Sequence, residues 1–342
     1  MSNKLIIISN ESVHQNNGLF YCDNLDHKSL PEGFSKNFEV TNIARKSKIK
    51  REHKINLNNT IVSANLFIFL LNVFRTFKKK EAKYLVISIT PYTFFASLLL
   101  IILKKNFFVY LRSDGYEEYK QIIGDIGKFL YHIMFTVVSW KANFISCRTH
   151  ILKKKNGKIV SPSQLSKKWF ESHKKPNLEK VKLLYIGRIK IEKGVFSLLN
   201  IIKNLDINFQ LTIVGAGFNN NVGKKIEQKN VSIINFKNTN DSIIEFYDKH
   251  NIFILPSFTE GHPQVLDEAL SRLRPVIIFE EISHVIGNRK GVFISKRDPL
   301  SLSKQINHIM NNYSDIVSEI MKNNLPTKDS FLEEMNKIIQ SN

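Results

Sequence analysis

The feature that most constrains this chain is a series of short, almost wholly apolar segments that alternate with longer segments of helical periodicity. The second half of the sequence contains six such segments, each five or six residues long. Short apolar strands separated by helices are typical of a parallel sheet covered on both faces. We therefore predict a doubly wound α/β domain here. Its strands are predicted at 182–187 (KLLYIG), 210–215 (QLTIVG), 231–236 (VSIINF), 251–256 (NIFILP), 275–279 (PVIIF) and 291–295 (GVFIS).

The first half repeats the pattern at 4–9 (KLIIIS), 84–89 (YLVISI), 106–111 (NFFVYL) and 142–147 (ANFISC), which predicts a second α/β domain. A length of 342 residues suits two domains. Residues 171–181 between them are polar, include a proline and lack apolar periodicity, so they are predicted to be a linker.

The predicted boundaries are a Rossmann-like domain over 1–170, a linker over 171–181, a second Rossmann-like domain over 182–325 and a final helix within 326–342. The two domains are expected to face each other across a cleft. Ligands of such sheets bind beyond the carboxyl ends of the strands.

The charge of the chain is divided unequally. The formal net charge is +20, and residues 1–175 hold 29 basic and 12 acidic side chains, a net +17. Such a field attracts polyanions, either nucleic acid or an anionic membrane. The aromatic residues lie mainly in apolar runs rather than among basic clusters, and no nucleic-acid-binding motif is present. We therefore favour a membrane surface.

Two apolar runs, 61–74 and 92–103, are shorter than the ~20 residues that a membrane-spanning helix needs. No transmembrane segment is expected. Lysines at 78–80 and 104–105 follow these runs, which is typical of an interfacial anchor. Each run can equally be a buried helix whose final lysines complement the helix dipole. With only Cys22 and Cys147 in the chain, a reducing compartment is expected.

Three predicted strand ends carry residues that suit a ligand site. Gly187-Arg188 follows one strand, and Lys193 precedes the next helix, so the two cations can hold a diphosphate at the helix start. A solvated basic loop is the alternative. After the next strand, Gly215 and Gly217 permit either close approach of a ligand or a tight turn.

The third strand end is FTEGHPQVLDEAL, residues 258–270. Pro263 suits the first turn of a helix, and Gly261 permits an unusual backbone angle before it. Glu260 and Glu268 can accept paired hydrogen bonds from the hydroxyls of a sugar or a ribose. Two unrelated surface acids are the alternative.

The order of these motifs, ending in FILPSFTEG.P.V..EAL and PVI, resembles glycosyltransferase family 4, the retaining GT-B enzymes of the group 1 glycosyl transferase type. The resemblance is close over about 180–300 and only general before it. Its signature is a pair of glutamates separated by seven residues, matched by Glu260 and Glu268. The resemblance implies a GT-B fold, a nucleotide-diphosphate sugar as donor, and a first domain that binds the acceptor.

The resemblance also implies roles for individual residues. Glu268 would hold the ribose of the donor, Glu260 the donor sugar, and Arg188 and Lys193 the diphosphate. The rest of the implied donor site is formed by Gly187, Gly215, Gly261, His262, Pro263, Gln264 and Val265. The chain lacks the Asp-x-Asp sequence of metal-dependent glycosyltransferases, so no metal and no cofactor are expected.

The chain departs from the family pattern at several positions. Leu273, flanked by two arginines, occupies the usual glycine position before the PVI strand. The first loop offers only Gly18 where relatives have paired glycines. Arg112 replaces the acceptor-side histidine and Asp114 is retained, so Asp114 is a candidate for orienting or deprotonating the acceptor, and Arg112 for binding an acceptor phosphate.

The favoured interpretation is a retaining glycosyltransferase that uses a saccharide or lipid-linked acceptor in bacterial surface polysaccharide synthesis. It is expected to be cytoplasmic and peripheral on the inner face of the plasma membrane, without a nucleic-acid partner. A GT-B nucleotide-sugar epimerase remains an alternative, as does, less favoured, a basic nucleic-acid-binding protein. By resemblance, the final helix packs toward the first domain, whereas an ordinary terminal helix on the second domain is the other possibility.

Overall fold

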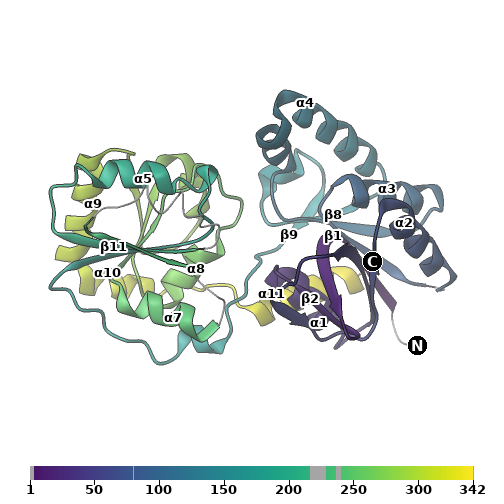
Figure 1. The fold of residues 1–342 in the computed structure, drawn as a ribbon, viewed down its shortest axis with the longest axis horizontal. Helices are drawn as coiled ribbons and strands as arrows, with labels where there is room; N and C mark the ends of the chain where they lie inside the picture. Colours follow the sequence, from purple (N-terminus) through teal and green to yellow (C-terminus); the bar gives the residue numbers. More distant parts are fainter. Residues whose placement is uncertain (1–3, 80, 216–228, 236–239, 342) are drawn as a thin grey trace. The chain divides into compact units, whose positions relative to one another are not determined.

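A computed structural model describes residues 4–79, 81–215, 229–235 and 240–341 (Figure 1). The chain divides into two compact units. Unit 1 comprises Met1–Gln164 together with Lys328–Asn342, and unit 2 comprises Leu165–Thr327.

Unit 1 is built on a sheet whose central strand is β1 (Lys4–Asn16), with parallel strands on both sides of it. β3 (Glu39–Ser47) and β5 (Thr60–Ser63) follow on one side. The other side carries β6 (Lys83–Ile87), β7 (Phe107–Leu111), β8 (Asn143–Ser146) and β9 (Gly157–Ile159). Beyond the bulge in β1, β2 (Leu19–Cys22) and β4 (His53–Ile55) add antiparallel pairs.

Alternate residues of these strands enter two separate cores, because successive side chains point to opposite faces of a sheet. Ile6 and Ile8 face α2 (Leu66–Arg75), α3 (Pro91–Ile102) and α4 (Gly115–Val138), which cover one side of the sheet. Leu5 and Ile7 face α1 (Leu25–Phe34) and α11 (Lys328–Gln340) on the other side.

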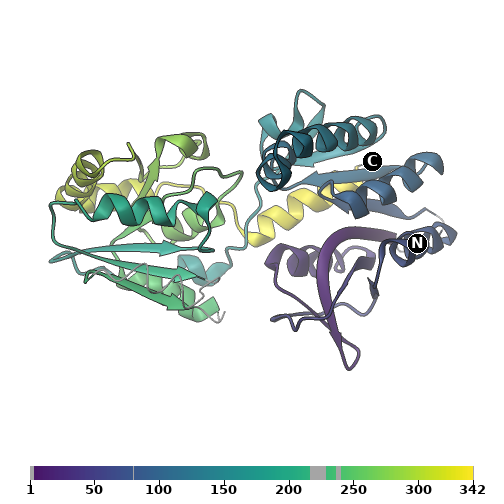
Figure 2. The ribbon, with the colours of Figure 1, turned by 45° about the horizontal axis from the view of Figure 1, so that its top comes forward.

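The terminal helix α11 therefore belongs to unit 1, although it follows unit 2 in the sequence; Figure 2 shows it beside the sheet of unit 1. Its apolar face, with Phe331 and Met335, is buried among residues of α1 and the central strands. Lys83 Nζ also donates to the Ile339 carbonyl at 2.7 Å. Of the two positions that the sequence left open for this helix, the structure has the one on the first domain.

The described residues of unit 2 form a sheet of six parallel strands in the order β12 (Val231–Asn235), β11 (Phe209–Gly215), β10 (Val181–Ile186), β13 (Ile252–Leu255), β14 (Val276–Phe279) and β15 (Val292–Ser295). In sequence order within the unit this is 3-2-1-4-5-6, the order of a Rossmann sheet. The predicted strands agree with these bounds to within one or two residues, so the doubly wound α/β prediction is confirmed.

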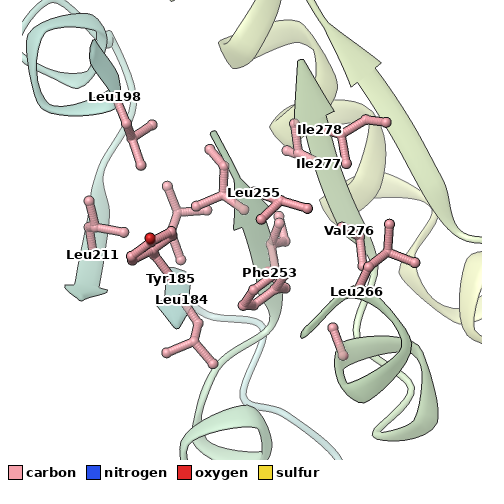
Figure 3. Packing of buried hydrophobic residues seen from close by; sticks show 14 of the residues in the cluster. Leu184, Tyr185, Leu198, Leu211, Phe253, Leu255, Leu266, Val276, Ile277 and Ile278 are labelled. Atoms are coloured by element: carbon pink, nitrogen blue, oxygen red, sulfur yellow. The ribbon is translucent and has the colours of Figure 1, made fainter. Parts of the chain in front are cut away.

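Helices cover both faces of this sheet, and Figure 3 shows the apolar side chains that join the layers. Leu198, Phe253 and Leu266 are among the buried residues of one continuous core. The helices are α5 (Val195–Ile202), α7 (Asn240–Lys249), α8 (Gln264–Ser271), α9 (Pro299–Asn311) and α10 (Tyr313–Ile320), with short 3-10 turns η3 (Lys167–Phe170), η4 (Ile191–Lys193) and η5 (Glu280–Val285). Unit 1 has two further 3-10 turns, η1 (Thr76–Lys78) and η2 (Thr149–Leu152).

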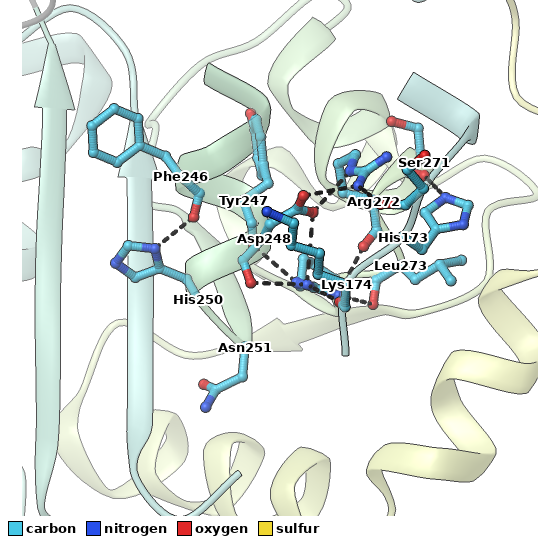
Figure 4. Close-up of polar contacts among 12 residues, drawn as sticks. His173, Lys174, Phe246, Tyr247, Asp248, His250, Asn251, Ser271, Arg272 and Leu273 are labelled. Carbon is cyan, nitrogen blue, oxygen red and sulfur yellow. Dashed lines mark hydrogen bonds and ion pairs between the residues drawn. The ribbon is translucent and has the colours of Figure 1, made fainter. Parts of the chain in front are cut away.

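The unit boundary lies earlier than the sequence predicted, because the predicted linker is tied to unit 2. Arg272 and Arg274 are almost fully buried, at 1% and 2% exposure. The Arg272 guanidinium forms a double hydrogen bond with Asp248 and donates to the carbonyls of residues 169, 171 and 172. Arg274 Nη2 donates to the Lys174 carbonyl at 2.7 Å. Figure 4 shows the double hydrogen bond between Arg272 and Asp248. Residues 165–174 are thus part of unit 2.

Candidate active site

The candidate site of unit 2 lies where the strand order reverses, between β10 and β13. Loops that leave the carboxyl ends of these two neighbouring strands diverge on either side, which is where doubly wound sheets bind ligands. The two loops are 187–194 and 256–263. Every described unit 2 residue that the sequence indicated for the donor site, apart from Gly215, lies on these loops or on the first two turns of α8.

Glycines allow these loops to touch. Gly194 has a φ of +67°, and a Cβ built there would lie 1.8 Å from the Pro256 carbonyl oxygen. Gly215, at the end of β11, approaches Gly187 so closely that a Cβ would lie 2.1 Å from its oxygen. A larger residue at either position would separate the loops. Gly217 lies outside the described residues.

Lys193 and Glu260 join the two loops by an ion pair. Lys193 Nζ lies 2.6 Å from Glu260 Oε1, and Ser257 Oγ donates to the same oxygen at 2.6 Å. The Glu260 side chain is only 10% exposed. His284 Nε2 lies 2.8 Å from the Glu260 backbone oxygen. The structure therefore brings together the cation and the carboxylate that the sequence assigned to diphosphate and sugar.

Glu268 has a different environment. It lies in the second turn of α8, and the Tyr247 hydroxyl donates to its Oε2 at 2.8 Å. Burial raises the pKa of Glu268 to about 7, the Asp267 charge adds to this, and the Tyr247 hydrogen bond opposes it. Near neutral pH the Glu268 carboxyl is therefore divided between its protonated and ionised forms.

A buried polar cluster supports the turn between the two glutamates. Asp267 accepts from Arg289 Nε at 2.5 Å and from Nη2 at 2.9 Å, and His262 Nε2 lies 3.4 Å from Asp267 Oδ2. Burial alone would raise the pKa of Asp267, but the hydrogen bonds from His262 and Arg289 hold it below its ordinary value. The side chain of His262 is thus buried, with only 4% of it exposed.

The remaining predicted donor residues lie around this turn. Pro263 precedes α8 and provides no side-chain cap, and Gln264 and Val265 are the first residues of the helix. Gly261 is in the same turn. The Arg188 side chain is exposed, and its backbone oxygen accepts from the Tyr185 hydroxyl at 2.9 Å.

Sequence reasoning missed Arg297, which supports the 256–258 segment from behind. Its guanidinium lies 4.1 Å from the ring centre of Phe258 and 4.4 Å from that of Phe279, and its Nη1 donates to the Pro256 carbonyl at 3.0 Å. It also missed Tyr247 and Ser257. Ser257 is only three residues before Glu260, within the same motif. No sequence pattern connects Arg297 or Tyr247 to the glutamates, since their contacts join different elements of the fold.

The predicted acceptor residues are all in unit 1. Asp114 caps α4 by accepting from the Tyr116 amide at 3.0 Å, and it pairs with Lys153 Nζ at 2.6 Å. Arg112 Nε lies 3.8 Å from Asp26 Oδ2 at the end of β7. Gly18 has a φ of +76° and forms the turn between β1 and β2 with Asn17, which accounts for the glycine without a ligand. Acceptor roles for these residues stay predictions.

Comparison with known proteins finds a family model that matches unit 2. Residues 166–326 match the model described as glycosyl transferases group 1. The match covers unit 2 almost from end to end and includes Glu260 and Glu268.

Two curated relatives have matching segments. The chain is 28% identical over 125 residues to the putative teichuronic acid biosynthesis glycosyltransferase TuaC of Bacillus subtilis, covering 36% of this chain and 31% of TuaC. It is 27% identical over 140 residues to the capsular polysaccharide biosynthesis glycosyltransferase CapM of Staphylococcus aureus, covering 38% of this chain and 37% of CapM. The aligned segments thus span about a third of these relatives.

Solved structures are similar over the whole chain. Sucrose-phosphate synthase from Thermosynechococcus elongatus has a TM-score of 0.73 at 14% identity, covering 99% of both chains. HepE of Anabaena, solved in complex with UDP and glucose, also has a TM-score of 0.73, at 10% identity, covering 99% of this chain and 100% of its own. At such identities the similarity concerns the fold alone, and the predicted GT-B fold with two Rossmann-like domains is confirmed.

Proposed function

We propose that this chain is a retaining glycosyltransferase that moves a sugar from a nucleotide-diphosphate sugar to a saccharide acceptor. The observation that carries the proposal is the Lys193–Glu260 ion pair at the switch point of a Rossmann sheet, with Glu268 in the helix that follows. A cation for a diphosphate and two acids for hydroxyl groups are what a nucleotide sugar requires.

The chemistry follows from the charge that develops. Cleavage of the bond between sugar and diphosphate leaves negative charge on the departing phosphate, and the transition state resembles an oxocarbenium ion. In this proposal Arg188, Lys193 and the first amides of α8 receive that charge. Preorganised donors of this kind contribute about 3–4 kcal/mol each to transition-state stabilisation. In this proposal Lys193 exchanges Glu260 for the diphosphate when the donor binds, and Glu260 then accepts from sugar hydroxyls.

The first test is a thermal-shift series with UDP, GDP, ADP and CMP, in which stabilisation by one nucleoside diphosphate identifies the donor base. The second is turnover of Lys193→Ala, expected to fall at least about a hundredfold. Lys190→Ala is the matched control, because Lys190 is an exposed lysine of the same loop whose Nζ lies 3.7 Å from Glu192. Equal turnover in the two folded variants would refute the assignment.

The acceptor proposal is a lipid-linked oligosaccharide of bacterial surface polysaccharide synthesis. It is supported by the similarity to TuaC and CapM, glycosyltransferases of teichuronic acid and capsular polysaccharide biosynthesis, and by the net +17 of residues 1–175. We accordingly propose a cytoplasmic enzyme, peripheral on the inner face of the plasma membrane. Among the residues that the structure describes, no helix is long and apolar enough to cross a bilayer. Transfer to lipid-linked saccharides extracted from membranes, compared with free oligosaccharides, tests the acceptor class.

Metal independence is proposed from the cations at the diphosphate position, with no cofactor beyond the donor substrate. Turnover is then expected to be unchanged in excess EDTA. A loss of activity that Mg²⁺ or Mn²⁺ restores would contradict this.

A further inference from the structure

Helix α4 carries two apolar stripes, of which one is buried in the core of unit 1 and the other is exposed. Tyr131, Met134 and Phe135 of the first stripe are buried against the sheet. The second stripe repeats at the same i, i+3, i+4, i+7 spacing but points outward; its four side chains are 43–71% exposed, namely Ile126, Phe129, Leu130 and Ile133. A helix of a soluble protein ordinarily has one such stripe, so the second requires a partner.

The outward sides of α3 and α2 extend this exposed apolar surface. In the core of unit 1, α3 packs against both α2 and α4. On α2, Phe67, Leu71 and Phe74 are exposed at i, i+4, i+7 spacing, while Phe69 and Val73 face the core. Of the 25 exposed large apolar residues described in the chain, 14 lie between residues 67 and 140. We call the outward side of α2, α3 and α4 the outer face of unit 1; Figures 1 and 2 show the three helices along one side of the sheet.

Basic residues border the outer face along one edge. Parallel strands joined by helices require those helices to run in a common direction, so their C-terminal ends lie at one edge. Exposed basic residues occur at or just after each of these ends: Arg75 and Lys78 for α2, Lys104 for α3 and Lys141 for α4. The helical backbone of α4 is interrupted at Ile123 and Gly124; the exposed acids Glu117 and Glu118 precede this break, and Asp125 directly follows it.

We propose that the outer face of unit 1 docks on an anionic lipid bilayer, its apolar side chains entering the headgroup region and its basic edge contacting lipid phosphates. This deepens the peripheral location in the proposed function by naming the surface and its partner. An apolar face with a cationic edge matches an anionic interface in both respects. A second copy of this chain fits less well, because two units that each carry a strong positive charge repel one another.

The chain has a built-in reporter of this docking. It contains two tryptophans, of which Trp140, just after α4, is 69% exposed and Trp169, in unit 2, is 7% exposed. Titration with vesicles of phosphatidylglycerol and phosphatidylethanolamine should shift the tryptophan emission to shorter wavelength, and Trp140→Phe should abolish the shift. Vesicles of phosphatidylcholine alone should bind much more weakly, because only the anionic lipid engages the basic edge.

Substitutions on the outer face then locate the contact. Ile126→Glu with Phe129→Glu should weaken partitioning at least about a hundredfold, because two apolar side chains no longer leave water. Lys104→Gln and Lys141→Gln should each weaken it about fivefold, an effect that disappears in high salt. The matched control is Leu300→Glu with Met321→Glu, which alters two equally exposed apolar residues of unit 2 and should leave partitioning unchanged.

Three results would overturn the proposal: unchanged binding by the Ile126/Phe129 variant, equal binding to phosphatidylcholine, or a dimer in light scattering that this variant converts to a monomer. The vesicle assay needs neither donor nor acceptor. If nucleoside diphosphates fail to bind while vesicle docking persists, the proposed function fails and the docking surface stands. The Ile126/Phe129 variant should also keep the thermal shift with nucleoside diphosphate, because unit 2 is unaltered.

Discussion

Leu273 occupies a backbone position that favours glycine. Its φ is +59°, directly after the end of α8. The Arg274 amide donates to the Ala269 carbonyl and the Leu273 amide to the Leu270 carbonyl, both at 2.9 Å. These two bonds define a Schellman motif, in which the left-handed residue is usually glycine. The structure thus explains why the family pattern leads one to expect glycine here, and it identifies a local strain in this chain.

The cost of this strain can be separated from the packing of the leucine side chain. Leu273 is half-buried against the core of unit 2. Leu273→Ala should lose about 1–2 kcal/mol of stability, less than a fully buried leucine would. Changing that alanine to glycine removes no further packing, and a left-handed conformation costs a side-chain-bearing residue about 1–2 kcal/mol. Leu273→Gly should therefore be more stable than Leu273→Ala by about 1 kcal/mol.

Urea unfolding in a Trp140→Phe background provides the measurement. The remaining tryptophan, Trp169, packs against Tyr247 at a ring-centre distance of 5.7 Å, so its fluorescence reports on unit 2. With a urea dependence of about 2 kcal/mol per molar, the glycine variant should unfold at a urea concentration about half a molar above the alanine variant.

A control pair at Asn307, an exposed position inside α9, should behave in the opposite way. There the backbone is helical, so Asn307→Gly should be about 1 kcal/mol less stable than Asn307→Ala. If glycine at 273 were no better than alanine, the left-handed backbone would carry no cost and the reasoning would be wrong.

Three further predictions concern the buried polar groups. The folded-state pKa of Glu268 is raised from 4.5 to about 7, so protonation of this carboxyl stabilises the fold fully below pH 4.5, and the contribution is lost as the pH rises through about 7. The thermal stability of the protein should therefore fall between pH 4.5 and about pH 7 relative to that of Glu268→Gln. Nucleoside diphosphate affinity, measured by calorimetry, should instead rise across about pH 6 to 8 relative to the same variant, since only the carboxylate accepts from both ribose hydroxyls, and Tyr247→Phe should move that rise to higher pH. Arg272→Met should destabilise unit 2 by about 3–5 kcal/mol in urea unfolding, because Asp248 loses its buried partner, and Asp248→Asn in the same chain should restore part of the loss.

The strands that the sequence predicted best are those that can be recognised from their own residues, without knowledge of the segments they contact. The strands of unit 2 are continuous apolar runs, so composition alone marks them. β3 was missed because Thr41 and Asn42 occupy two of its buried positions, where Asn42 lies 3.4 Å from His27 and Thr41 accepts from Lys79. Those polar residues hide the apolar periodicity, and only the tertiary contacts make them acceptable inside.

The β1–β2 hairpin was missed for a different reason. Asn17-Gly18 between two extended segments is a strong turn signal, with both residues at positive φ. The resemblance assigns Gly18 to an acceptor loop, whereas the backbone at this position forms the turn of the hairpin. The predicted linker carries no local sequence pattern that indicates its attachment to unit 2, because its partners Arg272 and Arg274 lie about a hundred residues away.

The side chains of Glu260 and Glu268 have different partners, and this difference predicts a different response of each carboxylate to ligand binding and to pH. Glu260 is paired with Lys193, and in the proposed function a phosphate replaces Glu260 in that pair, so that donor binding exchanges one charged contact for another. Glu268 has a hydroxyl partner in an environment that favours its protonated form, so sugar hydroxyls replace no strong ion pair there. The first carboxylate is thus coupled to the diphosphate and the second to the pH. Donor affinity should accordingly lose its pH dependence in Glu268→Gln but keep it in Glu260→Gln, and the reverse outcome would exchange the roles assigned to the two residues.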